Sequence, residues 1–90
     1  MIDVIQTTAE LFGITRDDLV GPSRARHIVE ARQAAAYALR QRFPSMSLCQ
    51  IGQLVGRKDH TTILHALQRA EQRAVANYDY ALRLSALLGR

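Results

Sequence analysis

Apolar residues recur at helical spacing along almost the whole of this chain, and the alternation of β-branched residues that marks strands is absent. The sequence therefore predicts an all-α fold. A chain of 90 residues can bury one modest core, so residues 1–90 are expected to form a single compact helical domain. Apolar residues make up 48% of the chain, which is enough for that core without a metal or a disulfide.

Local signals divide the chain into about six helices. Asp3 is placed to cap the first helix and Gly13 to end it. Thr15 and Asp18 have the spacing of a capping box for a single-turn helix through about Val20. Residues 21–25 then form a loop.

A long Ala-rich helix is predicted over about residues 26–43, and Pro44 ends it. Its polar side holds Gln33, Tyr37 and Arg40, and its apolar side consists of Ile28, Ala31, Ala35, Ala36, Leu39 and Phe43. Arg32 interrupts the apolar side. Either a structural arginine with a buried stem or a contact to a phosphate would explain it.

The next two helices are separated by the tight turn Gly56-Arg57-Lys58. Ser47 is a good cap for the first of them, in which the packed side consists of Leu48, Ile51, Gly52 and Val55. Gly52 in mid-helix indicates that another helix passes close by. Asp59 caps the second, longer helix, which reaches about residue 75 and turns inward Ile63, Ala66, Leu67, Ala70 and Ala74. This order predicts a helix-turn-helix.

A last helix is predicted over about residues 77–88. Its broad apolar surface consists of Tyr78, Ala81, Leu82, Leu84, Leu87 and Leu88. We expect this helix to close the core rather than to pair with a second copy of the chain.

Positive charge is concentrated in one third of the chain. The net charge is +4, but residues 24–58 hold seven Arg or Lys and one Glu, whereas residues 1–23 have a net charge of −3. A segregated basic segment favours a polyanionic partner, with nucleic acid first among the candidates, although a solvated basic face has the same composition.

The start of the second helix in a helix-turn-helix enters the major groove of DNA. Short polar side chains stand there: Asp59, His60, Thr61 and Thr62. An Asp accepts from the cytosine amino group, a His donates to a base acceptor, and a Thr methyl contacts the thymine methyl. Asp59 and Thr61 are also ordinary helix-capping residues.

The segment Ser23-Arg24-Ala25-Arg26 leads from a loop into a helix. Flexible arginines in such a loop can enter a narrow, A·T-rich minor groove, although a solvated basic loop has the same sequence. Side chains suited to phosphate contacts are those of Arg40, Arg57, Lys58 and Arg69.

Four segments carry a family resemblance: residues 23–26, 32–33, 47–52 and 56–66. Together they resemble the C-terminal DNA-binding domain (domain IV) of the DnaA-type bacterial replication initiators, and the likeness covers about residues 2–75. It implies a TrpR-like helix-turn-helix and binding to A·T-rich boxes of the TTATNCACA kind. It also implies a minor-groove role for Arg24 and base contacts by Asp59, His60, Thr61 and Thr62.

With the resemblance added, the residues assigned to phosphates are Arg26, Arg32, Gln33, Arg40, Ser47, Leu48 (through its backbone), Arg57, Lys58, His65 and Arg69. The chain departs from the family pattern at three places. Gly56-Arg57-Lys58 replaces Gly-Gly-Arg, Cys49 replaces a proline that contacts a base methyl, and the loop around Pro44 is one residue longer.

Several other functions are not expected. The sequence lacks a GxxxxGK[ST] loop, so we expect no nucleotide and no origin unwinding by this chain alone. His60 and His65 are five residues apart, which does not make a helical metal pair, and we expect no metal, no cofactor and no enzyme activity. Cys49 stands alone and is interpreted as a small, half-buried filler. The apolar runs are too short to cross a bilayer, so we expect a soluble, cytoplasmic protein with no membrane partner.

The sequence thus predicts a module that binds double-stranded DNA sequence-specifically, in replication initiation, its regulation or transcription control. The start at Met1 favours a free-standing domain. The alternative is a protein-interaction adaptor with a vestigial DNA face, in which the acidic N-terminal region or the last helix docks an unknown protein. RNA binding is disfavoured by the few aromatic residues.

Overall fold

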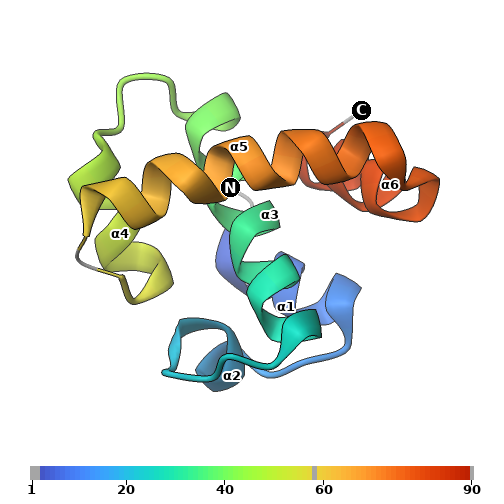
Figure 1. The fold of residues 1–90 in the computed structure, drawn as a ribbon, viewed down its shortest axis with the longest axis horizontal. Helices are drawn as coiled ribbons and strands as arrows, with labels where there is room; N and C mark the ends of the chain where they lie inside the picture. The colour runs from blue at the N-terminus through green and yellow to red at the C-terminus, as the bar shows by residue number, and fades with distance from the viewer. Residues whose placement is uncertain (1–2, 58, 90) are drawn as a thin grey trace.

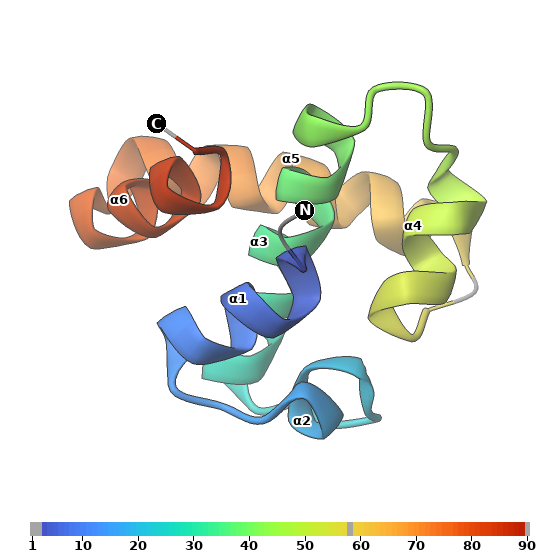
Figure 2. The same cartoon turned by 180° about the vertical axis from the view of Figure 1, so that it is seen from behind.

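The computed structural model describes residues 3–57 and 59–89. It contains the helices α1 (Val4–Phe12), α2 (Arg16–Val20), α3 (Arg26–Arg42), α4 (Leu48–Val55), α5 (His60–Ala76) and α6 (Tyr78–Leu87), and no strand occurs within the described ranges. The all-α prediction is confirmed. Seen from the front and from behind, α4 and α6 lie at opposite ends of α5 (Figures 1 and 2).

The first two helices begin and end where local chemistry predicts. The Asp3 side chain accepts a hydrogen bond from the backbone N–H of Gln6 at 3.1 Å and so caps α1. Gly13 ends α1 in the left-handed conformation, with φ of 68°. Thr15 and Asp18 form the expected capping box at the start of α2, with hydrogen bonds of 3.0 and 3.2 Å.

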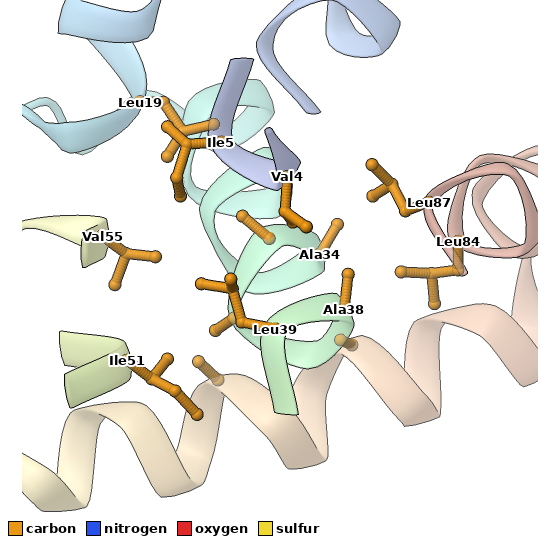
Figure 3. Close-up of a cluster of buried hydrophobic side chains, with 14 of the residues drawn as sticks. Val4, Ile5, Leu19, Ala34, Ala38, Leu39, Ile51, Val55, Leu84 and Leu87 are labelled. Carbon is orange, nitrogen blue, oxygen red and sulfur yellow. The ribbon is translucent and has the colours of Figure 1, made fainter. Parts of the chain in front are cut away.

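Helix α3 is the central helix and contacts each of the other five. Figure 3 shows Leu39 facing Ile51 and Val55, while Ala34 and Ala38 lie toward Leu84 and Leu87 of α6. The expected apolar side is confirmed and is broader than predicted, because Arg32, Ala34 and Ala38 are also buried along it. The polar side with Gln33, Tyr37 and Arg40 lies opposite and is less buried. The buried residues of α3 are Ile28, Ala31, Arg32, Ala34, Ala35, Ala36, Ala38 and Leu39. The alanine side chains are short, so the neighbouring helices can approach this broad side closely.

Helix α6 closes the core, as expected. Its buried residues are Tyr80, Leu84 and Leu87, and the Tyr80 hydroxyl donates to the carbonyl oxygen of Glu30 in α3 at 2.8 Å. The register within α6 differs from the prediction, since Tyr78 is 76% exposed and takes no part in the core. Burial follows residues 80, 84 and 87, so position 78 falls on the opposite side of the helix.

None of the described helices combines the length and the apolar character that a membrane crossing requires. The part of the chain that the structure describes also lacks any group of three His, Cys, Asp or Glu residues arranged to hold a metal ion.

Candidate nucleic-acid interface

Helices α4 and α5 are joined by a turn that depends on two glycines. Gly56 ends α4 with φ of 78°, and a Cβ there would collide with the carbonyl oxygen of Val20 at the end of α2. Gly52 was expected to mark the close approach of another helix. The nearest atom to a Cβ at Gly52 is instead the carbonyl oxygen of Arg57 in the turn, with Ile63 of α5 behind it at 3.5 Å. Gly52 therefore permits the turn first and the helix contact second.

The start of α4 gathers three of the residues assigned to phosphates. Ser47 and Gln50 form a capping box, with hydrogen bonds of 3.1 and 2.9 Å between side chain and backbone. Arg40 reaches from α3 and donates to the carbonyl oxygen of Met46 at 2.7 Å. Arg40 and the segment Ser47–Leu48 are thus held together around the loop that precedes α4.

Cys49 is exposed in the first turn of α4, so the interpretation as a half-buried filler was wrong. The packed side of α4 consists of Ile51, Gly52 and Val55, and position 49 lies off that side. The thiol lies on the surface next to Ser47 and Leu48.

The start of α5 presents polar side chains to solvent. The Asp59 carboxylate accepts from the backbone N–H of Thr61 at 2.9 Å and caps the helix. His60, Thr61 and Thr62 follow in the first turn, and all four side chains are exposed. Ile63 and Ala66 anchor the same helix in the core, so the tip of α5 projects from a fixed base.

The loop of residues 21–25, here called the arginine loop, holds Arg24 in an exposed position. The hydroxyl of Ser23 accepts from the backbone N–H of Ala25 at 3.2 Å. This local hydrogen bond between residues 23 and 25 spans Arg24 and restricts its backbone.

Arg32 lies in the second turn of α3 and is 7% exposed. Its Nε donates to the carbonyl oxygen of Leu19 at 2.7 Å, and its Nη2 donates to the carbonyl oxygens of Gly21 and Ser23 at 3.1 and 3.2 Å. Burial, and then the nearby positive charge of Arg57, lower the pKa of Arg32 to about 10, so the side chain stays charged at neutral pH. These hydrogen bonds favour the structural role over the phosphate contact for Arg32.

A hollow of about 520 Å³ lies between the arginine loop, α3 and the first turns of α5. This basic hollow is lined by Pro22, Arg24, Val29, Arg32, Gln33, Ala36, Val55, Arg57, Thr62, Ile63, His65, Ala66 and Arg69. Four of these residues are arginines and none is acidic. The hollow therefore favours an anion. Arg24 and Thr62 both line it and so lie on the same side of the molecule.

Gln33 is held by a residue that the sequence analysis did not connect with the site. Arg73 of α5 donates to the Gln33 side-chain oxygen, and its Nε lies 3.5 Å from the Glu30 carboxylate. The Arg73 guanidinium also lies over the Tyr80 ring, 5.3 Å from its centroid. Gln33 also lines the basic hollow, and because its oxygen already accepts from Arg73, its amide N–H groups are the part of the side chain left to donate.

Arg73 could have been found from its position, since it lies four residues after Arg69 on the same helix face. Of the remaining phosphate assignments, Arg26 is exposed at the start of α3 and pairs with Glu30 at 3.3 Å. His65 and Arg69 are exposed and line the basic hollow. Lys58 lies outside the described residues.

A family model described as the bacterial dnaA protein helix-turn-helix matches residues 1–70. Among curated proteins, the chromosomal replication initiator protein DnaA of Bifidobacterium animalis subsp. lactis is 43% identical over 81 residues, covering 84% of this chain and 14% of that protein.

Two further relatives carry the same name. The protein from Leifsonia xyli subsp. xyli is 44% identical over 70 residues, which cover 78% of this chain and 15% of the relative. The protein from Clavibacter sepedonicus is 41% identical over 81 residues, which cover 84% of this chain and 17% of the relative. The chain thus spans 14–17% of the length of these proteins.

Proposed function

Because the chain belongs to the family of bacterial DnaA helix-turn-helix domains, we propose that it binds double-stranded DNA at A·T-rich sites that resemble the DnaA box. The tip of α5 lies in the major groove and the arginine loop lies in the adjacent minor groove. Binding serves replication initiation, its regulation or transcription control, and involves no catalytic step.

The observation that carries this proposal is the position of the basic hollow. An element in the major groove and an element in the neighbouring minor groove must straddle one sugar-phosphate strand. The hollow lies between two such candidates, the first turn of α5 and the arginine loop, and four arginines line it. A phosphate strand in this place would meet the guanidinium groups of Arg24 in the loop, Arg57 in the turn and Arg69 in α5, with Gln33 of α3 beside them.

The roles divide by exposure and position. Asp59, His60, Thr61 and Thr62 reach base edges in the major groove, and Arg24 reads the narrow minor groove. Gln33, Arg57, His65 and Arg69 contact the strand between them. Residues around the start of α4 contact a second stretch of backbone: Arg40, Ser47 and the backbone of Leu48.

Selection of bound duplexes from a random pool tests the proposal. The full chain is expected to enrich a short A·T-rich box. The variant Arg24→Ala is expected to lose the A·T preference at one end of the box, because only the minor-groove contact is removed. Tyr78→Ala, which changes an exposed residue at the start of α6, is the control and should select the same box as the unchanged chain.

Absence of any enriched sequence would refute this function and favour the protein-interaction adaptor instead. If Arg24→Ala selects the same box as the unchanged chain, the proposed DNA binding stands but the minor-groove role of the arginine loop is refuted.

A further inference from the structure

Arg32 is unusual among the described residues because it carries a full charge and is buried. Thr8 and Arg32 are the buried polar or charged residues in this part of the chain. A buried guanidinium is stable only when hydrogen bonds replace its lost hydration. Arg32 obtains these from four backbone carbonyls, those of Asp18, Leu19, Gly21 and Ser23, at 2.7 to 3.5 Å.

The four acceptors all belong to one short stretch of chain, residues 18–23. Leu19 is near the end of α2, where carbonyl groups have no partner within the helix, and Gly21 and Ser23 are in the arginine loop. Arg32 itself is in α3, the central helix of the fold. One side chain therefore joins the end of α2 and the first part of the arginine loop to the central helix of the fold.

The backbone next to Arg24 is fixed on both sides by this arrangement. The Ser23 carbonyl accepts from Arg32, and the Ser23 hydroxyl accepts from the N–H of Ala25. The Arg24 side chain thus extends from an anchored backbone, so the loop loses less conformational entropy when it binds.

We infer that Arg32 is a positioning residue for minor-groove recognition: it holds the arginine loop so that Arg24 meets the minor groove in register with the tip of α5. This inference rests on the proposed DNA binding. It replaces the direct phosphate contact for Arg32 with an indirect role in base-pair preference.

Two variants separate the hydrogen-bonding fork of Arg32 from its charge. Arg32→Lys keeps the charge but loses the planar fork, and a lysine remains a good ligand for phosphate. Arg32→citrulline, made by chemical synthesis, keeps an Nε–H and a terminal NH₂ group but is neutral. A positioning role depends on the fork, and a phosphate contact depends on the charge.

Relaxation of the backbone ¹⁵N nuclei tests the first step in the free protein, without DNA. In Arg32→Lys the order parameters of residues 21–25 are expected to fall from about 0.85 toward about 0.6, with those of α5 unchanged. Arg69→Lys is the matched control, since it changes another arginine that lines the hollow. A loop as rigid in Arg32→Lys as in the unchanged chain would overturn the inference.

Binding to substituted duplexes tests the second step. Each A·T pair of the selected box is replaced by G·C, or by inosine·C, which lacks the minor-groove amino group of G·C but shares its major-groove pattern. At the end read by the loop, the unchanged chain is expected to prefer inosine·C over G·C by about tenfold. Arg32→Lys should reduce that ratio to about threefold or less and leave the preferences read by α5 intact.

Arg32→citrulline is expected to keep the preference for inosine·C and the salt dependence of the unchanged chain. It also tests the inference if Arg32→Lys does not fold. A salt slope that becomes shallower by about 0.9 in the citrulline variant would identify a phosphate contact and overturn the inference. Equal losses at both ends of the box in Arg32→Lys would overturn it as well. If the unchanged chain prefers no duplex, the proposed function fails and the specificity role fails with it, whereas the relaxation data still report whether Arg32 holds the loop.

Discussion

Asp59 combines a stabilising and an unfavourable property at the start of α5. Its carboxylate caps the helix through the N–H of Thr61, but its negative charge stands where DNA phosphates would approach. Asp59→Asn keeps a capping oxygen and removes the charge, so we expect stability within about 0.5 kcal/mol of the unchanged chain and tighter binding to scrambled duplexes. Asp59→Ala loses the cap as well and should cost about 1 kcal/mol in urea unfolding. Equal destabilisation by both variants would show that the charge, and not the cap, matters for folding.

Thr61 and Arg69 lie on the same helix but are assigned different roles. Thr61→Ala removes a candidate base contact, so it should lower the affinity for the selected box by about 1–3 kcal/mol and leave scrambled duplexes unaffected. Arg69→Ala removes a charge that carries no sequence information, so it should weaken both kinds of duplex alike. Titrations with matched and scrambled duplexes measure both effects. The same pattern of loss for the two variants would contradict the division of roles.

At the scale of elements, the turn between α4 and α5 is packed against the end of α2. Gly13→Ala and Gly56→Ala both place a side chain in the left-handed region, which costs about 1–2 kcal/mol. A Cβ at Gly13 has no atom within 4 Å, whereas a Cβ at Gly56 would collide with the Val20 carbonyl. We therefore expect Gly56→Ala to reduce the free energy of unfolding clearly more than Gly13→Ala does. Similar losses of unfolding free energy in the two variants would mean that the end of α2 moves away from the new side chain at no energetic cost.

Tyr80, which joins α6 to α3, makes the free energy of unfolding depend on pH in the alkaline range. Burial raises the pKa of the Tyr80 phenol from 10.0 to about 12. Between these values the unfolded chain releases the proton that the folded chain keeps, so this contribution to stability is complete below pH 10 and is lost as pH rises toward 12. The lowered pKa of Arg32 acts with the opposite sign in the same range, because the folded chain there releases a proton that the unfolded chain keeps.

Tyr80→Phe isolates the tyrosine contribution, since Arg32 is common to both proteins. Urea unfolding from about pH 8 to about pH 11 should show a stability difference that shrinks as pH rises. A difference that stays constant over this range would mean that Tyr80 is not buried from solvent.

Sequence reasoning succeeded where a helix end depends on neighbouring residues. Thr15 with Asp18, Ser47 and Asp59 are caps because their side chains reach a backbone N–H two or three residues away, whatever the rest of the fold does. It failed where burial depends on partners distant in the chain. Alanine carries a weak signal, so the buried side of α3 was drawn too narrow and left out Ala34 and Ala38. Tyr78 was expected on the apolar surface of α6 but is exposed, and Tyr80 is buried instead.

The candidate site divides in the same way. The exposed tip of α5 follows from spacing alone, and its side chains are where the sequence analysis expected them. The basic hollow requires α3, the turn and α5 to meet, and spacing within one helix does not show this. Arg32 remained open for the same reason, since its acceptors are at least nine residues away in the sequence.

At the scale of the whole molecule, the positions of the basic residues matter more for the proposed DNA binding than the net charge does. The hollow at one end of α5 collects arginines from several elements, and α6 lies at the other end (Figure 1). Arg83 of α6 is exposed and lies over the Phe12 ring, 4.8 Å from its centroid. Arg83 carries the same charge as Arg69, but it lies over Phe12 and away from the proposed DNA strand.

This separation predicts how salt acts on binding. If about six phosphates are neutralised, the logarithm of the affinity should fall with the logarithm of salt concentration at a slope near −5. Arg69→Ala should make that slope shallower by about 0.9, because one phosphate contact is lost. Arg83→Ala changes the net charge equally and should leave the slope unchanged, since counterions are released only where the protein meets the DNA. Equal changes in slope for both variants would mean that the protein attracts DNA through its total charge, and the strand would then have no defined path through the basic hollow.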